Sequence, residues 1–150
     1  MSTSKRAALA AVALILAIVA AGFLWHVVQK RPSADTTDAT LVALGKRVYE
    51  QHCASCHGAK LEGQPNWQQR LANGRLPAPP QDAAGHTWHH PDKELFEITK
   101  EGPSAIVPGY QSDMPAFRTV LSDNEIWAAL AYIKSTWPPD IRARQPPAKE

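Results

Sequence analysis

Two cysteines and a histidine stand close together and form the most reactive combination in the chain. Cys53 and Cys56 are separated by two residues, and His57 follows directly. Each thiol can add to one haem vinyl group as a thioether, and this spacing lets both sulfurs reach one edge of the same macrocycle. The next imidazole then points at the iron from the same side. The pattern predicts one covalently attached haem, bound through Cys53 and Cys56, with His57 as an iron ligand.

Other interpretations of the same residues remain open. A thiol–disulfide redox pair of the thioredoxin type favours a strand–helix–strand setting, which the surrounding sequence does not predict. A structural zinc ion needs four ligands, and His52 is too close in sequence to Cys53 to be an easy fourth. The last alternative is a pair of unreactive buried cysteines that precede a histidine by chance.

A second iron ligand is predicted at Met114. It lies in a polar, proline-bearing stretch, and the only other methionine is Met1. A thioether sulfur is a soft ligand that suits haem iron, and His/Met ligation raises the reduction potential. The alternative is that Met114 only covers the haem edge.

Three further histidines are rival ligands. His86, His89 and His90 lie close together just before Pro91, and such clustering can indicate metal binding. We expect them instead to satisfy local hydrogen bonds, to cap a helix or to contact a haem propionate.

Three main helices are predicted to position these residues. The first begins near Ala39, carries apolar residues at helical spacing and leads into Cys53. The second covers residues 92–101, with Pro91 at its first position and a glycine as its stop. The third follows the Ser-Asp-Asn-Glu capping box that starts at Ser122. Glycine and proline make the segments between them irregular, so a buried haem would supply the hydrophobic centre that a small domain lacks.

The N-terminal part predicts a membrane element. Residues 7–28 carry no formal charge and reach roughly 33 Å as a helix, at about 1.5 Å per residue, which is enough to cross a bilayer core. A cleaved signal peptide is the alternative, with Lys5 and Arg6 as its basic start and a small-residue site at residues 20–22. The apolar run is longer than the usual signal core of about 7–15 residues, which favours a retained anchor.

The chain then divides into five parts. We expect residues 1–6 to be cytoplasmic, the anchor to be followed by a linker at 29–38, and the haem domain to cover 39–137. Residues 138–150 are expected to be a flexible tail.

The net charge of +2 is unevenly distributed along the chain. The first 31 positions hold four basic residues and no acidic residue, and the remainder holds 12 basic and 14 acidic side chains. No basic cluster remains to indicate a nucleic-acid partner.

These features resemble the class I (mono-haem) cytochrome c family, in a membrane-anchored bacterial type. The resemblance covers about residues 39–137. It depends on the attachment motif Cys53 to His57 and on the distal loop, where Met114-Pro115 is followed by Phe117. The last helix contributes Ala131 to Lys134, and the first helix contributes a small-plus-aromatic pair, Gly45 with Tyr49.

The resemblance implies an all-α cytochrome c fold, with about three main helices and long loops around one haem c. The uncharged composition of residues 7–28 adds an N-terminal transmembrane helix before this domain. It implies His57 as proximal ligand and Met114 as distal ligand. A backbone carbonyl, at Pro79 or Pro80, would accept a hydrogen bond from the other His57 nitrogen and tune the iron. The first and last helices would cross near residues 129–133.

The expected function is transfer of single electrons rather than catalysis, because His57 and Met114 would leave iron no open position. No catalytic residue is expected. Haem attachment outside the cytoplasm places the domain on the periplasmic side of a bacterial inner membrane, with redox proteins as partners. Two alternatives stay open: an electron-entry subunit of a larger oxidase or reductase, and a haem enzyme or gas sensor if Met114 does not bind iron.

Overall fold

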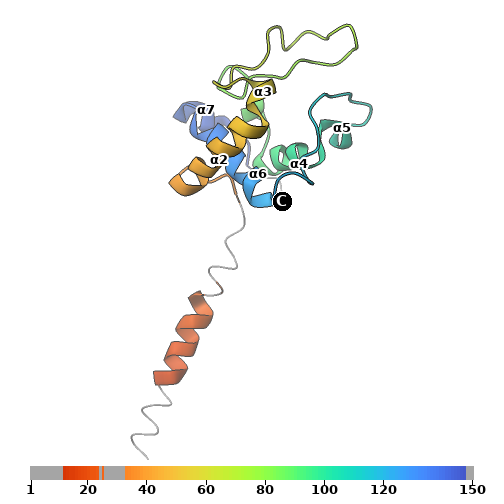
Figure 1. Ribbon diagram of the computed structural model, residues 1–150. Helices are drawn as coiled ribbons and strands as arrows, with labels where there is room; N and C mark the ends of the chain where they lie inside the picture. The colour runs from red at the N-terminus through yellow and green to blue at the C-terminus, as the bar shows by residue number, and fades with distance from the viewer. Residues whose placement is uncertain (1–11, 24, 26–32, 148–150) are drawn as a thin grey trace, which may run out of the picture. The chain divides into compact units, whose positions relative to one another are not determined.

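The computed structural model describes residues 12–23, 25 and 33–147. All regular elements in this part of the chain are helices (Figure 1), which confirms the predicted all-α class for it. In chain order from residue 33 they are α2 (Ala39–His52), α3 (Ala54–His57), the 3₁₀ helix η1 (Thr87–His89), α4 (Asp92–Glu101), α5 (Pro103–Ile106), α6 (Asp123–Ser135) and α7 (Pro139–Arg144).

The chain forms two compact units, Met1–Pro32 and Ser33–Glu150. Residues 12–23 of the first unit are helical. Among the described residues, no helix combines the length and the apolar character needed to cross a membrane. The predicted anchor at 7–28 extends past the described residues at both ends, and the predicted cytoplasmic residues 1–6 lie outside them altogether.

Helices α2 and α6 cross in close contact at Gly45. A Cβ atom at Gly45 would lie 1.8 Å from the carbonyl oxygen of Ala128 and 2.9 Å from Cβ of Tyr132. Only glycine allows the two backbones to approach so closely. One turn further along α2, the rings of Tyr49 and Tyr132 lie 5.5 Å apart in a tilted contact. The crossing implied by the family resemblance is confirmed, and its closest point lies at Ala128.

Local capping fixes where the main helices start. The Asp38 side chain accepts hydrogen bonds from the backbone N–H groups of Thr40 and Leu41, both at 3.0 Å. At α6, the Ser122 backbone N–H donates to the Glu125 carboxylate at 2.8 Å, and the Ser122 side chain accepts from the Glu125 backbone N–H. The predicted capping box is confirmed. Helix α4 has the predicted bounds, although Pro91 is its N-cap rather than its first residue.

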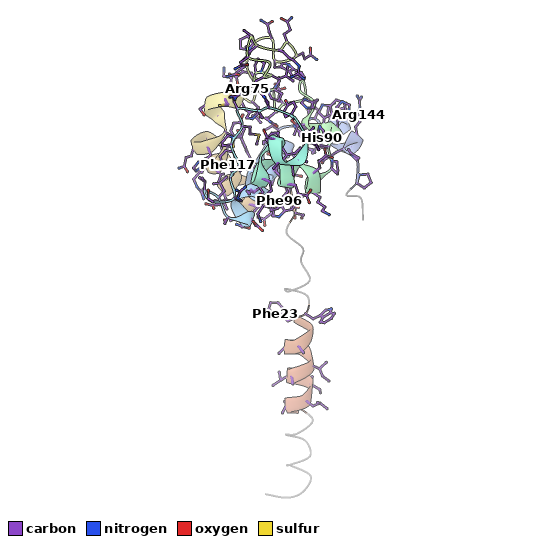
Figure 2. The ribbon with its side chains drawn as sticks, turned by 90° about the vertical axis from the view of Figure 1, so that its right-hand side faces the viewer. Phe23, Arg75, His90, Phe96, Phe117 and Arg144 are labelled. Carbon is purple, nitrogen blue, oxygen red and sulfur yellow. The ribbon has the colours of Figure 1, made fainter. Side chains whose placement is uncertain are left out.

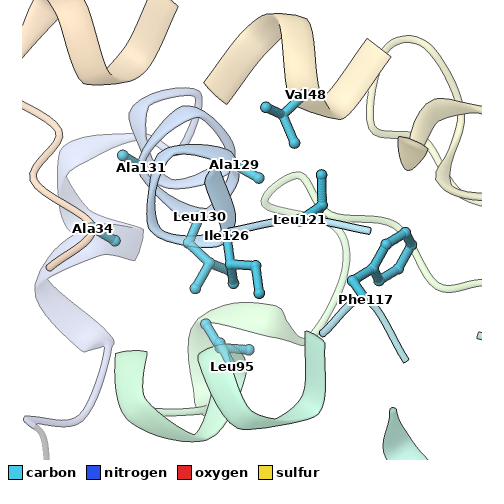
Figure 3. Packing of buried hydrophobic residues seen from close by; sticks show 9 residues of the cluster. All are labelled: Ala34, Val48, Leu95, Phe117, Leu121, Ile126, Ala129, Leu130 and Ala131. Carbon is cyan, nitrogen blue, oxygen red and sulfur yellow. The ribbon is translucent and has the colours of Figure 1, made fainter. Parts of the chain in front are cut away.

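Two hydrophobic clusters form the core. The larger one lies where α2, α4 and α6 meet (Figure 3) and contains Ala34, Val48, Leu95, Phe117, Leu121, Ile126, Ala129, Leu130 and Ala131. The smaller one contains Tyr49, Leu61, Ile133 and Trp137, with Cys53 partly buried against it. The attachment motif therefore adjoins the smaller cluster.

The predicted linker at 29–38 is partly wrong. Ala34 is only 5% exposed and packs in the larger cluster. The compact unit begins at Ser33, so residues 33–38 belong to the domain and not to a linker. Residues 29–32 lie outside the described part of the chain.

The predicted flexible tail at 138–150 also differs from the structure. Residues Pro139–Arg144 form α7. The Arg142 guanidinium donates to the Trp137 carbonyl oxygen at 2.6 Å, and the Gln145 amide donates to the Asp92 carboxylate at 2.8 Å. Pairs of prolines and alternating charges predict disorder, but these contacts attach the segment to α4 and to Trp137 in the turn after α6. Residues 148–150 are outside the description.

Replacing Gly45 by alanine is expected to destabilise the domain, although alanine is the better helix former by about 1 kcal/mol. The new methyl group would overlap the Ala128 carbonyl, and overpacking of this kind costs roughly 1–3 kcal/mol. The midpoint of urea unfolding measures the effect. Ala43→Ser, at an exposed position of α2, should change the unfolding free energy by about 0.5 kcal/mol or less. A midpoint for Gly45→Ala equal to or above that of the parent protein would contradict the close crossing.

Candidate haem-binding site

The short helix α3 brings the predicted attachment residues together. Cys53 ends α2 and is also the N-cap of α3. Its carbonyl oxygen accepts from the backbone N–H groups of Cys56 at 3.1 Å and His57 at 2.9 Å. Residues three and four positions apart share one face of a helix, so the three side chains emerge on the same side of a single turn. Both cysteines are free thiols.

The environment of Cys53 argues against a thiol–disulfide redox centre. Burial raises the pKa of the Cys53 thiol to about 11, and the neighbouring Cys56 adds to the effect. A redox cysteine needs a lowered pKa and a ready thiolate. Within the described residues, no group of three or more His, Cys, Asp or Glu side chains is arranged to hold a metal ion, so the structure gives the zinc interpretation no support.

His57 is buried, and one of its ring nitrogens is already engaged. Its Nδ1 lies 2.8 Å from the carbonyl oxygen of Pro79. Burial lowers the pKa of His57, and the Pro79 carbonyl acts in the opposite direction. A neutral ring whose Nδ1–H donates to Pro79 keeps the Nε2 lone pair free for a metal. Of the two prolines named from the sequence, Pro79 supplies the carbonyl.

Two paired segments hold the Pro79 carbonyl in place. The Gln81 backbone N–H donates to the Leu61 carbonyl oxygen at 2.8 Å, and the Gln64 backbone N–H donates to the Ala78 carbonyl oxygen at 2.9 Å. Gly63 makes the pairing possible because its φ is +70° and a Cβ there would lie 2.4 Å from the backbone nitrogen of Pro80. Any other residue at this position would be strained and would push the segment away.

A tryptophan connects this segment to the last main helix. Trp137, only 1% exposed, donates from Nε1 to the Gln81 carbonyl oxygen at 2.8 Å. The Gln81 carboxamide lies between His57 and Thr87, 3.1 Å from Nδ1 of His57 and 2.7 Å from the Thr87 hydroxyl. The sequence analysis did not identify Gln81, Thr87 or Trp137. No short-range pattern marks this group, because Gln81 meets His57 across 24 positions and Trp137 across 56.

Tyr49 stabilises the turn that follows His57. Gly58 has φ +83° and ends α3. Its carbonyl oxygen accepts a hydrogen bond from the Tyr49 hydroxyl at 2.8 Å, and Tyr49 is fully buried. Burial raises the pKa of Tyr49, and the nearby Cys53 adds to the increase. Tyr49 therefore stays a neutral donor and ties α2 to the residue beside His57.

Met114 lies on a different part of the chain, in the segment between α5 and α6. That segment is attached to the end of α4, because the backbone N–H groups of Phe117 and Arg118 donate to the carbonyl oxygens of Thr99 and Lys100 at 3.2 and 3.0 Å. Met114 is partly buried against the larger cluster, whereas Cys53 packs against the smaller one. The segments that carry the two predicted iron ligands, His57 and Met114, are therefore held by different parts of the core.

An ion pair joins the loop 64–77 to the segment that carries Met114. Arg75, labelled in Figure 2, pairs with Asp113, the residue next to Met114. Both side chains are substantially exposed, and exposed pairs contribute only about 0–1 kcal/mol. The pair orients the two segments more than it stabilises them.

The three rival histidines make local contacts. His90 Nδ1 lies 2.9 Å from the Glu94 carboxylate in the first turn of α4, which confirms the expected local role for this residue. His86 stacks on Trp67 with ring centroids 5.4 Å apart, and His89 stacks on Trp88 at 3.7 Å. Burial of its ring and the nearby His90 and His89 lower the pKa of His86.

A family model described as cytochrome c oxidase, cbb3-type, subunit III matches residues 40–133 of the chain. The chain belongs to this cytochrome c family. The resemblance to mono-haem cytochromes c is thereby confirmed, and the family implies covalently attached haem c with its iron. The residues present fit this group, since α3 offers two free thiols one turn apart and a histidine whose Nδ1 is already bound.

Curated relatives include three kinds of cytochrome. The chain is 38% identical over 58 residues to the cytochrome bc1 complex cytochrome c subunit of Mycobacterium tuberculosis, covering 37% of this chain and 21% of that protein. It is 31% identical over 98 residues to the cbb3-type cytochrome c oxidase subunit CcoP of Azospirillum brasilense, covering 65% and 29%. It is 29% identical over 82 residues to cytochrome c-555 of Prosthecochloris aestuarii, covering 51% and 83%.

The matches to the two subunits span less than a third of their lengths. No solved structure gives a significant match to the chain. The comparisons therefore identify this part of the chain as a cytochrome c domain.

Replacing Tyr49 by phenylalanine is expected to lower the unfolding free energy of the haem-loaded protein by roughly 1–3 kcal/mol, because the Gly58 carbonyl would lose its buried donor. Tyr132→Phe is the matched control, since it keeps the ring contact with Tyr49 and removes no hydroxyl that donates to Gly58. Denaturant titration of both variants measures the difference. Equal losses in the two variants would show that the hydroxyl of Tyr49 does not support the turn.

Proposed function

We propose that Cys53 and Cys56 bind one haem c through thioethers and that Nε2 of His57 and Sδ of Met114 are its axial ligands. We propose further that the protein carries single electrons between membrane or periplasmic redox partners. The hydrogen bond from His57 to Pro79 is the main support, because it leaves Nε2 as the one free ring nitrogen beside the paired cysteines.

The bound haem supplies a one-electron iron couple. The protein's own residues orient the histidine that binds the iron and hold its hydrogen-bond partner in place. Pro79 orients the His57 ring and fixes the tautomer, and Trp137 holds the backbone from which that carbonyl projects. Met114, on a separately supported segment, would supply the second iron ligand. With both positions filled there is no open site for a substrate, so outer-sphere transfer follows, and no residue is assigned a catalytic role.

We place the haem domain on the periplasmic side of a bacterial inner membrane, attached by residues 7–28 as a single span. The uncharged composition of that segment and the helix over residues 12–23 support the assignment. Mass spectrometry of the membrane fraction tests it. An intact N-terminus in that fraction is expected, whereas a chain shortened near residues 20–22 and released from the membrane would show a cleaved signal instead.

Membership of a larger complex is the second candidate function. The family description and the two relatives named as complex subunits favour it. In that case the domain would be an electron-entry module rather than an independent carrier. Extraction in a mild detergent separates the two possibilities, because a module would co-purify with other subunits and a carrier would not.

Replacing both Cys53 and Cys56 by alanine should abolish the haem stain on a denaturing gel, because no thioether can then form. The protein should be expressed together with the haem-attachment machinery. Ser55→Ala, which keeps both thiols and the spacing between them, should stain like the parent protein. Covalent haem in the double variant would refute the attachment assignment.

Replacing Met114 by leucine should remove the absorption band typical of an iron–thioether bond and lower the reduction potential. The reduced variant should then bind carbon monoxide rapidly, while the parent protein should not. Val120→Ala, at an exposed position in the same segment between α5 and α6, should keep the band. Rapid binding by the parent protein would mean an open iron site and would favour the haem enzyme or gas sensor.

A further inference from the structure

Two polar groups crowd around Nδ1 of His57, and only one of them has a role so far. The Pro79 carbonyl oxygen lies 2.8 Å from this nitrogen, and Nε2 of the Gln81 carboxamide lies 3.1 Å from it. At its other end, the Gln81 carboxamide oxygen accepts from the Thr87 hydroxyl at 2.7 Å. The carboxamide therefore spans the distance between the imidazole and Thr87.

Counting protons shows that this arrangement cannot persist when His57 binds iron through Nε2. Nδ1 then carries the ring proton and donates to Pro79. An amide nitrogen can only donate, so the Gln81 NH₂ group would face a second donor at 3.1 Å. A half-turn of the carboxamide exchanges its oxygen and nitrogen with almost no change in shape. The oxygen then accepts from Nδ1–H, and the NH₂ group donates to the Thr87 hydroxyl, which can accept as well as donate.

The backbone of Gln81 is fixed tightly enough to keep the carboxamide there. Its N–H donates to the Leu61 carbonyl oxygen at 2.8 Å, and its own carbonyl oxygen accepts from Nε1 of Trp137 at 2.8 Å. Thr87 is only 6% exposed. With both of its backbone groups and the end of its side chain engaged, Gln81 remains beside His57.

We propose that Gln81 is a positioning residue that acts on the iron through His57. In the haem-loaded protein its carboxamide oxygen shares the Nδ1 proton with the Pro79 carbonyl and lowers the reduction potential. A second acceptor increases the electron density of the imidazole, and a more basic ligand favours ferric over ferrous iron. The inference rests on the proposed role of His57 as an axial ligand.

Spectroelectrochemical titration of the haem-loaded protein tests the proposal. Gln81→Leu keeps similar bulk and removes the acceptor, so its midpoint potential should rise. Gln68→Leu is the matched control, since it makes the same chemical change at an exposed position of the loop 64–77. Its potential should stay at the parent value.

The sign of the shift identifies which end of the carboxamide faces the imidazole. A fall in potential for Gln81→Leu, no change, or equal shifts in both variants would overturn the proposal. Thr87→Val removes the hydroxyl that contacts the far end of the Gln81 carboxamide, and its midpoint potential should rise by less. This variant tests the proposal if Gln81→Leu does not accumulate with haem. No rise in that variant would then overturn the proposal. A parent protein without a histidine-ligated haem would instead refute the proposed function itself.

Discussion

The hydrogen bond between His57 and the Pro79 carbonyl is the constraint around which the site is organised. It selects the tautomer that leaves Nε2 free. A carbonyl can do this only if its backbone is rigid, and two glycines allow that segment to pack tightly. Gly63 lies against the backbone of Pro80, and a Cβ at Gly85 would lie 2.0 Å from the Pro80 carbonyl oxygen. The irregular region between α3 and α4 is thus closely packed around the carbonyl.

The helix crossing at Gly45 determines whether that arrangement can form. Helix α2 ends at Cys53 and supplies Tyr49, while the turn that follows α6 supplies Trp137. Tyr49 and Trp137 belong to the same small cluster. A wider separation of α2 and α6 would move the His57 turn away from the segment that carries Pro79. Helix packing and the placement of the His57 ring are therefore parts of one arrangement.

Signals between close neighbours in the chain were sufficient to predict α4, the capping box at Ser122 and the attachment motif, because the interacting groups lie within one helical turn. The same approach missed Gln81, which meets His57 across 24 positions and Trp137 across 56. It also missed α7, whose contacts reach back to α4. Ala34 was assigned to a linker because nothing in a short polar stretch indicates that one methyl group is buried in the core.

The loop 64–77 is closed at its base by two hydrogen bonds between the same two residues. The Gln64 backbone N–H donates to the Ala78 carbonyl oxygen, and the Ala78 N–H donates to the Gln64 side chain, both at 2.9 Å. A loop closed in this way can change in length without moving the residues on either side of its base. Insertions and deletions between these two residues would leave the Pro79 carbonyl where it is. Related chains can therefore diverge here in length and in surface chemistry while the contact between His57 and Pro79 stays the same.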